Sequence, residues 1–259
     1  NINNGGPHPS IPEVQRRVRP FFNSVTLRDP GSNSSYNALA VKVEKRFAKG
    51  LTFLAAYTWS HNIDQSEQSL DEGVSGRANQ YDLRNERGNS SLDRRHNFVG
   101  SFTYELPWGR GQRLLGGWQV GGILSLRTGT PFDVSYPGDP QNSGTQNRGN
   151  RIASGTLDNP TIDRWFDETA FVASPPGVFG NTGRNVLYGP GARNLDLTVS
   201  KRFALPWERH AVQFRFESFN VTNTPAFGQP NSNLRAQATG TITEADEPRR
   251  IQFALKYTF

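Results

Sequence analysis

Runs of about ten residues in which apolar and polar side chains alternate recur along this sequence. A period of two places every second side chain on the same face of a β-strand. The run length matches the roughly 9–11 residues of a tilted membrane-crossing strand, whereas soluble strands average about five or six. Seven such runs are present, at residues 36–47, 51–60, 98–106, 118–127, 195–203, 212–217 and 251–259.

The connections between these runs alternate between short and long. An outer-membrane β-barrel sorts its connections in this way, with short turns on the periplasmic side and long loops on the extracellular side. A soluble β-sandwich has no reason to do so, and it stays as the alternative. The short turns are at 48–50, 107–116 and 204–209, and the long polar loops are at 64–94, 130–193 and 221–248.

Composition excludes several other classes of protein. The 259 residues include no cysteine, so disulfides and thiolate metal sites are excluded. No stretch approaches the roughly 18–20 apolar residues of a membrane helix. The net charge of +6 is compatible with nucleic-acid or lipid headgroup binding. Because the chain has no basic helix and no aromatic-and-glycine sheet pattern, no nucleic-acid partner is expected.

Aromatic and basic residues recur where strands meet short turns. Lys45-Arg46-Phe47 matches Lys201-Arg202-Phe203, 156 positions later. These triplets predict a cation at lipid headgroup depth beside an aromatic ring in the interfacial belt. Trp108 and Trp207, each following Leu-Pro, are predicted at the same periplasmic edge. The alternative is that these aromatics anchor turns of a soluble protein. In the longest loop, packing is expected around Trp165, Phe166, Phe171 and Phe179.

The order and spacing of several motifs over roughly residues 19–259 resemble the C-terminal barrel of TonB-dependent receptors. The closest likeness is to the Oar-like group, which carries an N-terminal carboxypeptidase-regulatory-like domain. The motifs are Ser35-Tyr36-Asn37-Ala38-Leu39, Glu44-Lys45-Arg46-Phe47, the strand 51–60, Asp93-Arg94-Arg95-His96-Asn97-Phe98, Leu106-Pro107-Trp108-Gly109, Gly117-Trp118-Gln119, Gly129-Thr130-Pro131-Phe132, Phe219-Asn220-Val221-Thr222-Asn223 and the aromatic terminus.

This resemblance implies an all-β fold: an antiparallel up-and-down transmembrane β-barrel, represented by a C-terminal segment of about seven to eight strands with long extracellular loops. Residues 1–35 are expected to be an extracellular loop or an incomplete strand, and residues 36–259 the barrel strands. Family parts not seen here are the plug, the energy-coupling box and the regulatory-like domain. An odd strand number also predicts that more strands complete the barrel.

The implied function is transport of a bulky substrate across the bacterial outer membrane. Coupling to the TonB energy complex would occur through N-terminal parts that this sequence lacks. Two alternatives remain open. One is a small independent outer-membrane barrel with a structural or enzymatic role, and the other is a soluble β-sandwich binding module.

Catalytic and metal chemistry are not expected. The four histidines, His8, His61, His96 and His210, lack partners at metal-ligand spacing, so neither a metal nor a cofactor is predicted. No Gly-x-Ser-x-Gly motif is present. Barrel enzymes carry acid and base groups near the outer rim, and His61, Asp64 and Glu67 could imitate such a group. We favour the interpretation that these three are solvated loop residues and that the chain is not an enzyme.

Substrate contacts are predicted only as loop candidates, namely Arg84, Arg87, Trp165 and Tyr188. The stretch from Arg77 to Arg95 mixes arginines with Asp82, Glu86 and Asp93. A solvated, internally paired loop is the favoured interpretation of this stretch. The alternative is contact with anionic lipopolysaccharide or with substrate.

Alternation also assigns the two faces of the predicted wall. Leu197, Val199, Phe214 and Phe253 are expected to face lipid, and Thr198, Ser200, Arg215 and Gln252 to face the lumen. The last strand ends on an aromatic residue, which resembles the terminal signal read by the barrel-assembly machinery. The expected partners are that machinery, outer-membrane lipid and lipopolysaccharide. The signal residues are Ile251, Phe253, Leu255, Tyr257 and Phe259.

Overall fold

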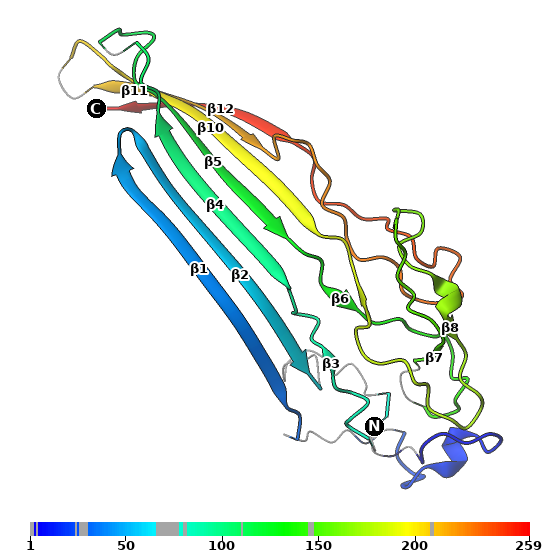
Figure 1. Cartoon of the computed structure of the whole chain (residues 1–259). Helices are drawn as coiled ribbons and strands as arrows, with labels where there is room; N and C mark the ends of the chain where they lie inside the picture. Colours follow the sequence, from blue (N-terminus) through cyan, green and yellow to red (C-terminus); the bar gives the residue numbers. More distant parts are fainter. Residues whose placement is uncertain are drawn as a thin grey trace.

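The computed structural model describes residues 3, 5–23, 25, 31–65, 78–79, 82–109, 111–144, 148–207 and 210–259. Within them, long strands form one antiparallel sheet, which Figure 1 shows as a long twisted wall. Its seven long strands confirm the seven predicted runs: β1 (Ser34–Ala48), β2 (Leu51–Asp64), β4 (His96–Glu105), β5 (Trp118–Arg127), β10 (Ala192–Ala204), β11 (Ala211–Phe219) and β12 (Arg250–Thr258).

The strands follow one another across the sheet in chain order, as an up-and-down topology requires, and β1 and β12 form its two edges. The first hairpin is longer than predicted, because β2 continues past Ser60 to Asp64. Its turn consists of Lys49 and Gly50, with φ values of 53° and 81°. Two consecutive positive φ angles are typical of the two-residue hairpin turn, and glycine adopts such an angle without a steric cost.

Cross-strand partners lie on the same face of a sheet, so the register separates the two faces. One row runs through Val43, Ala55, Gly100, Leu124 and Leu195, and it is apolar throughout. The register confirms both predicted groups. The first is Leu197, Val199, Phe214 and Phe253 on the apolar face, and the second is Thr198, Ser200, Arg215 and Gln252 on the polar face.

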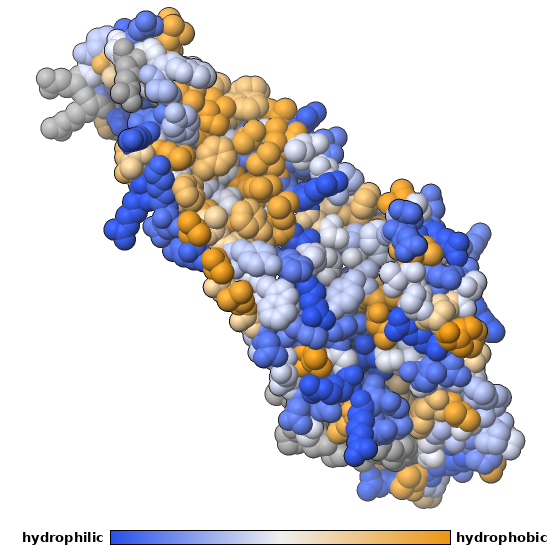
Figure 2. All heavy atoms as spheres, in the orientation of Figure 1, coloured by the Kyte–Doolittle hydropathy of each residue, from blue (hydrophilic) through white to orange (hydrophobic). Residues whose placement is uncertain are grey.

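Most of the apolar face of the long strands is left uncovered by the described part of the chain. Phe253 is 71% exposed and Leu255 is 76% exposed. Figure 2 shows the apolar side chains gathered over the strands and the polar ones over the loops. Exposed apolar area costs roughly 25 cal/mol per Å² in water, so this face requires an apolar surrounding. The alternative of a soluble β-sandwich is therefore wrong, because no second sheet covers this face within the described residues.

A compact apolar cluster lies among the long loops instead. Phe132 and Phe171 each contact Phe166, with ring centroids 5.9 Å and 6.1 Å apart. The predicted packing is thus correct for Phe166, Phe171 and the adjoining Trp165, whereas Phe179 is only partly buried and lies outside the cluster. We call this cluster the loop core; its buried members are Phe132, Val134, Tyr136, Phe166, Ala170, Phe171, Leu187 and Leu234.

Short elements complete the loops. The described residues contain no helix long and apolar enough to cross a membrane. The short strands are β3 (Gly88–Asn89), β6 (Pro131–Phe132), β7 (Asn150–Arg151), β8 (Phe171–Val172) and β9 (Leu187–Tyr188), and the 3₁₀ helices are η1 (Glu13–Arg16) and η2 (Glu168–Ala170).

The two ends of the sheet differ in what they carry. The short turns and Phe259 lie at one end, and the long loops lie at the other (Figure 1). The N-terminal segment belongs to the loop end, because the Asn142 amide donates hydrogen bonds to the carbonyl oxygens of His8 and Ile11 (3.0 and 2.7 Å). In an outer-membrane barrel the end with the long loops faces the exterior.

Candidate functional site

Five charged residues are buried where the sheet meets the long loops. We call Asp64, Glu86, Asp93, Arg148 and Arg184 the charge layer; each has at most 8% of its surface exposed. Arg148 pairs with Glu86, and Arg184 pairs with Asp64. Buried charges are tolerated when they are paired and hydrogen-bonded, so these pairs fix the loops to one another and to the end of β2.

The burial of two charge-layer residues contradicts the predicted solvation of residues 77–95. Glu86 and Asp93 are 1% and 0% exposed, so the prediction of a solvated stretch is wrong for both. Glu86 accepts a hydrogen bond from the Asn79 N–H inside this stretch (3.1 Å), but its ion-pair partner Arg148 belongs to the next long loop. Arg84 and Arg87 are exposed, as a substrate or lipid contact requires, and Arg77 lies outside the described residues.

The described residues do not form the enzyme-like group that His61, Asp64 and Glu67 could have made. His61 and Asp64 belong to β2 rather than to a loop, and Glu67 lies outside the described residues. The His61 Nε2 atom lies 2.8 Å from a guanidinium nitrogen of Arg95, and Asp64 pairs with Arg184. Asp64 is 8% exposed, so its assignment as a solvated loop residue is wrong.

Tyr188 and Trp165 take part in the loop scaffold. The Tyr188 hydroxyl donates to Asp93 (3.1 Å) and accepts from Arg95 (3.2 Å). Burial raises the pKa of Tyr188, and the Asp93 carboxylate adds to this rise while Arg95 opposes it. The Trp165 indole donates to the Tyr188 carbonyl oxygen (2.8 Å). Because their polar groups are engaged within the protein, these two candidates offer a ligand mainly their ring surfaces.

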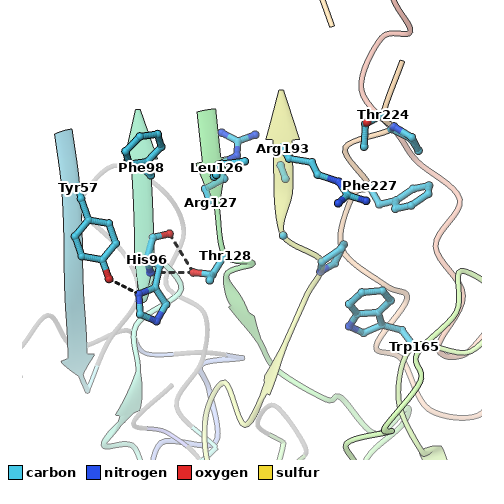
Figure 3. Close-up of a pocket in the computed structure, with 14 residues that line it drawn as sticks. Tyr57, His96, Phe98, Leu126, Arg127, Thr128, Trp165, Arg193, Thr224 and Phe227 are labelled. Carbon is cyan, nitrogen blue, oxygen red and sulfur yellow. Dashed lines mark hydrogen bonds between the residues drawn. The ribbon is translucent and has the colours of Figure 1, made fainter. Parts of the chain in front are cut away.

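A groove of about 690 Å³ opens between the strand ends and two loops. We call it the rim groove, and Figure 3 shows the side chains around it. Its volume lies within the roughly 300–1,000 Å³ of typical ligand pockets, and its lining is mainly apolar. The lining residues are Tyr57, His96, Phe98, Leu126, Arg127, Thr128, Trp165, Pro190, Gly191, Ala192, Arg193, Thr224, Pro225 and Phe227.

The floor of the rim groove is held in place by polar contacts. The Tyr57 hydroxyl and the His96 Nδ1 atom are 2.8 Å apart, and their rings are stacked. The Thr128 N–H donates to the His96 carbonyl oxygen (3.0 Å), which continues the pairing of β4 with β5. Arg193 extends from β10 toward Phe227 (Figure 3).

Sequence reasoning did not find this groove, although one signal for it was present. Arg193 precedes Leu195, Leu197 and Val199 in the same alternation, which places its side chain on the apolar face. The loop residues that form the other wall carry no periodic pattern that could have indicated their position.

At the short-turn end, the turn between β4 and β5 covers Lys201. Its ammonium donates to the carbonyl oxygens of Arg113 (2.8 Å) and Leu114 (2.7 Å), next to the ring of Trp118. Lys201 is 3% exposed. The headgroup depth expected for the Lys201-Arg202-Phe203 triplet stays a prediction, and the structure adds that backbone carbonyl oxygens hold the Lys201 ammonium.

The last strand ends in a ladder of rings on the apolar face. Trp207, His210, Tyr257 and Phe259 follow one another with centroids 6.2, 5.6 and 6.0 Å apart. Phe259 is 91% exposed. The ladder joins the turn between β10 and β11 to the chain end and places an aromatic ring at the predicted membrane boundary.

The structure itself offers no metal centre within its described part: no group of three or more histidine, cysteine or acidic side chains is arranged there to hold a metal ion.

Comparison with known families agrees with this geometry. The comparison with curated proteins finds no match. A family model for an outer membrane beta barrel domain matches residues 1–252, nearly the whole chain. The uncovered apolar face, the sorted loops and this match together establish that the chain belongs to the outer membrane beta barrel domain family and lies in the bacterial outer membrane.

Proposed function

We propose that this chain forms part of the wall and the exterior loop layer of a transport barrel of the TonB-dependent type. The observation that carries the proposal is the two-faced sheet capped at one end by packed loops. The polar face, with Thr198, Ser200 and Arg215, suits a water-filled lumen. The loops above it are held by the charge layer and the loop core, as a wall around a substrate entrance requires.

The two sheet edges support a larger assembly. The outer edges of β1 and β12 carry backbone groups that the described sheet leaves unpaired. In lipid each unpaired backbone group costs several kcal/mol, so a membrane sheet must close on itself or pair with further strands. We propose that further strands pair with these edges and that a plug domain and the energy-coupling complex act with this wall.

A non-catalytic role is part of the proposal. The His61 Nε2 atom contacts Arg95, and the Asp64 Oδ1 atom pairs with Arg184, which favours a structural role for both residues. Substrate contact is assigned to exposed loop residues, foremost Arg84 and Arg87. The ring surfaces of Trp165 and Tyr188 stay as secondary candidates.

A cysteine-labelling experiment tests the transport assignment without knowledge of the substrate. The sequence contains no cysteine, so a single Thr198→Cys variant of the complete protein carries one thiol in this chain. A water-soluble thiol reagent should label it from the lumen, and faster in energised cells than in cells without the TonB complex. The matched Leu197→Cys variant should not be labelled. Equal labelling of Thr198→Cys with and without the TonB complex contradicts energy-coupled transport.

A further inference from the structure

The rim groove is continuous with the apolar face that meets lipid. Phe98, Leu126 and Arg193 are direct cross-strand neighbours and form the last row of this face before the loops. The strands below the groove are β2, β4, β5 and β10, which are interior strands of the sheet. Further strands that pair with the edges at β1 and β12 therefore do not cover it.

The loops build an overhang above this row. The Trp165 indole is fixed by its bond to the Tyr188 carbonyl oxygen, and Phe227 is held by a β-bridge to Ala245. Both rings line the groove (Figure 3). Because of this overhang, the lipid-facing surface ends in a recess. Its volume of about 690 Å³ can hold part of one apolar molecule.

One cation lies on the groove side of the sheet. Arg193 is exposed, and it forms no ion pair among the described residues. Arg127 also lines the groove, but it follows Leu126 in β5, so its side chain belongs to the polar face. Two carboxylates line an adjoining cavity with Arg193: Glu247 is engaged by Arg250 (2.8 Å), and Asp246 is exposed.

We propose that the rim groove binds one phosphorylated glycolipid of the outer leaflet. An acyl chain lies against Phe98, Leu126 and Phe227, and a headgroup phosphate lies at the guanidinium of Arg193. Arginine suits this role because its planar fork donates two hydrogen bonds to phosphate oxygens. The site belongs to the lipid-facing side, so it is separate from the lumen and does not depend on the proposed transport function.

Native mass spectrometry of the full chain in detergent, with bisphosphorylated lipid A as the probe, tests the proposal. The parent protein should bind one lipid with preference over the dephosphorylated lipid. Arg193→Glu should weaken binding of the phosphorylated lipid about tenfold or more, since one charge-assisted contact is worth roughly 1.5–3 kcal/mol and 1.4 kcal/mol is tenfold. Binding of the dephosphorylated lipid should change little, which separates a lost phosphate contact from misfolding.

Two further variants sharpen the test. Arg19→Glu reverses the charge of an exposed arginine in the N-terminal segment, at the loop end but with no assigned binding role, and should leave lipid binding unchanged. Thr224→Trp fills the groove and should weaken binding of both lipids. Equal binding by the parent and Arg193→Glu overturns the proposal, as does an equal loss in Arg19→Glu. Displacement of the lipid by inorganic phosphate at a similar concentration also overturns it, because the site would then bind free phosphate rather than a lipid.

Discussion

Glu86 and Arg148 form a buried ion pair between two long loops, although 62 positions separate them in the sequence. Their side chains are 1% and 3% exposed. Removing one partner leaves an uncompensated buried charge, which costs about 3–5 kcal/mol. We therefore expect Arg148→Met to loosen the loop layer while the strands stay intact. Limited proteolysis of intact cells should show faster cleavage within residues 128–191.

Two variants serve as controls for this loop prediction. Arg164→Ala breaks the exposed pair with Asp167 and should leave the cleavage rate close to that of the parent. The double variant Glu86→Leu with Arg148→Met removes both charges and should recover much of the lost protection. Cleavage of Arg148→Met at the parental rate would show that the pair does not hold the loops.

The two faces of β10 should respond oppositely to a charge. Leu197 lies on the apolar face and Thr198 on the polar face. Leu197→Arg should destabilise the membrane-embedded protein by about 2–4 kcal/mol if the residue lies near mid-membrane, whereas Thr198→Arg should have a mild effect because water reaches the lumen. Unfolding titrations of the complete protein in lipid vesicles measure both changes. An equal loss of stability in the two variants contradicts the face assignment.

Tyr188 should make the loop layer sensitive to alkaline pH. Burial raises its pKa above the ordinary value of 10.0, so the folded loops favour the protonated phenol. This contribution to stability is complete below pH 10 and is lost as the pH rises through the raised pKa. An ultraviolet absorbance titration should show one late-titrating phenol in the parent that is missing in Tyr188→Phe. Identical titration curves would show that no buried phenol of this kind exists.

The aromatic residues Tyr257 and Phe259 should contribute to assembly. Tyr257 and Phe259 continue the ring ladder that begins at Trp207 and His210. Deletion of Phe259 from the complete protein should lower its amount in the outer membrane and increase periplasmic degradation. Substrate affinity of the assembled molecules should not change. Thr258→Ala, on the polar face, is the control and should assemble normally. Unchanged surface abundance after removal of both Tyr257 and Phe259 counts against an assembly signal.

The wall could be predicted from the sequence because its side-chain pattern is local. In residues 195–199 the alternation of Leu195, Asp196, Leu197, Thr198 and Val199 specifies both the strand and its two faces. Short hairpin turns then fix three neighbouring pairs, β1 with β2, β4 with β5 and β10 with β11. The other three pairs are joined by long loops, and they are expected only from the up-and-down order of an outer-membrane barrel.

The loop layer and the rim groove could not be predicted in this way. Glu86 and Arg148 stand in aperiodic segments, and nothing near either residue specifies the other as its partner. Lys201 has the sequence context of an interfacial cation, yet the carbonyl oxygens of Arg113 and Leu114 bind it. The groove combines strand ends with Trp165 and Phe227 from separate loops. Such sites depend on long-range packing that local propensity does not encode.

The loop core also determines what an immune system meets on the bacterial surface. Phe166 and Phe171 are buried, as are the charges of the charge layer, so the residues that distinguish these loops chemically are mostly hidden. What remains exposed includes continuous stretches of the loops, among them residues 158–164 and 243–250. Antibodies raised against peptides from these two stretches should therefore recognise the folded protein, whereas peptides that contain the buried residues of the loop core or the charge layer will be poor immunogens for this surface.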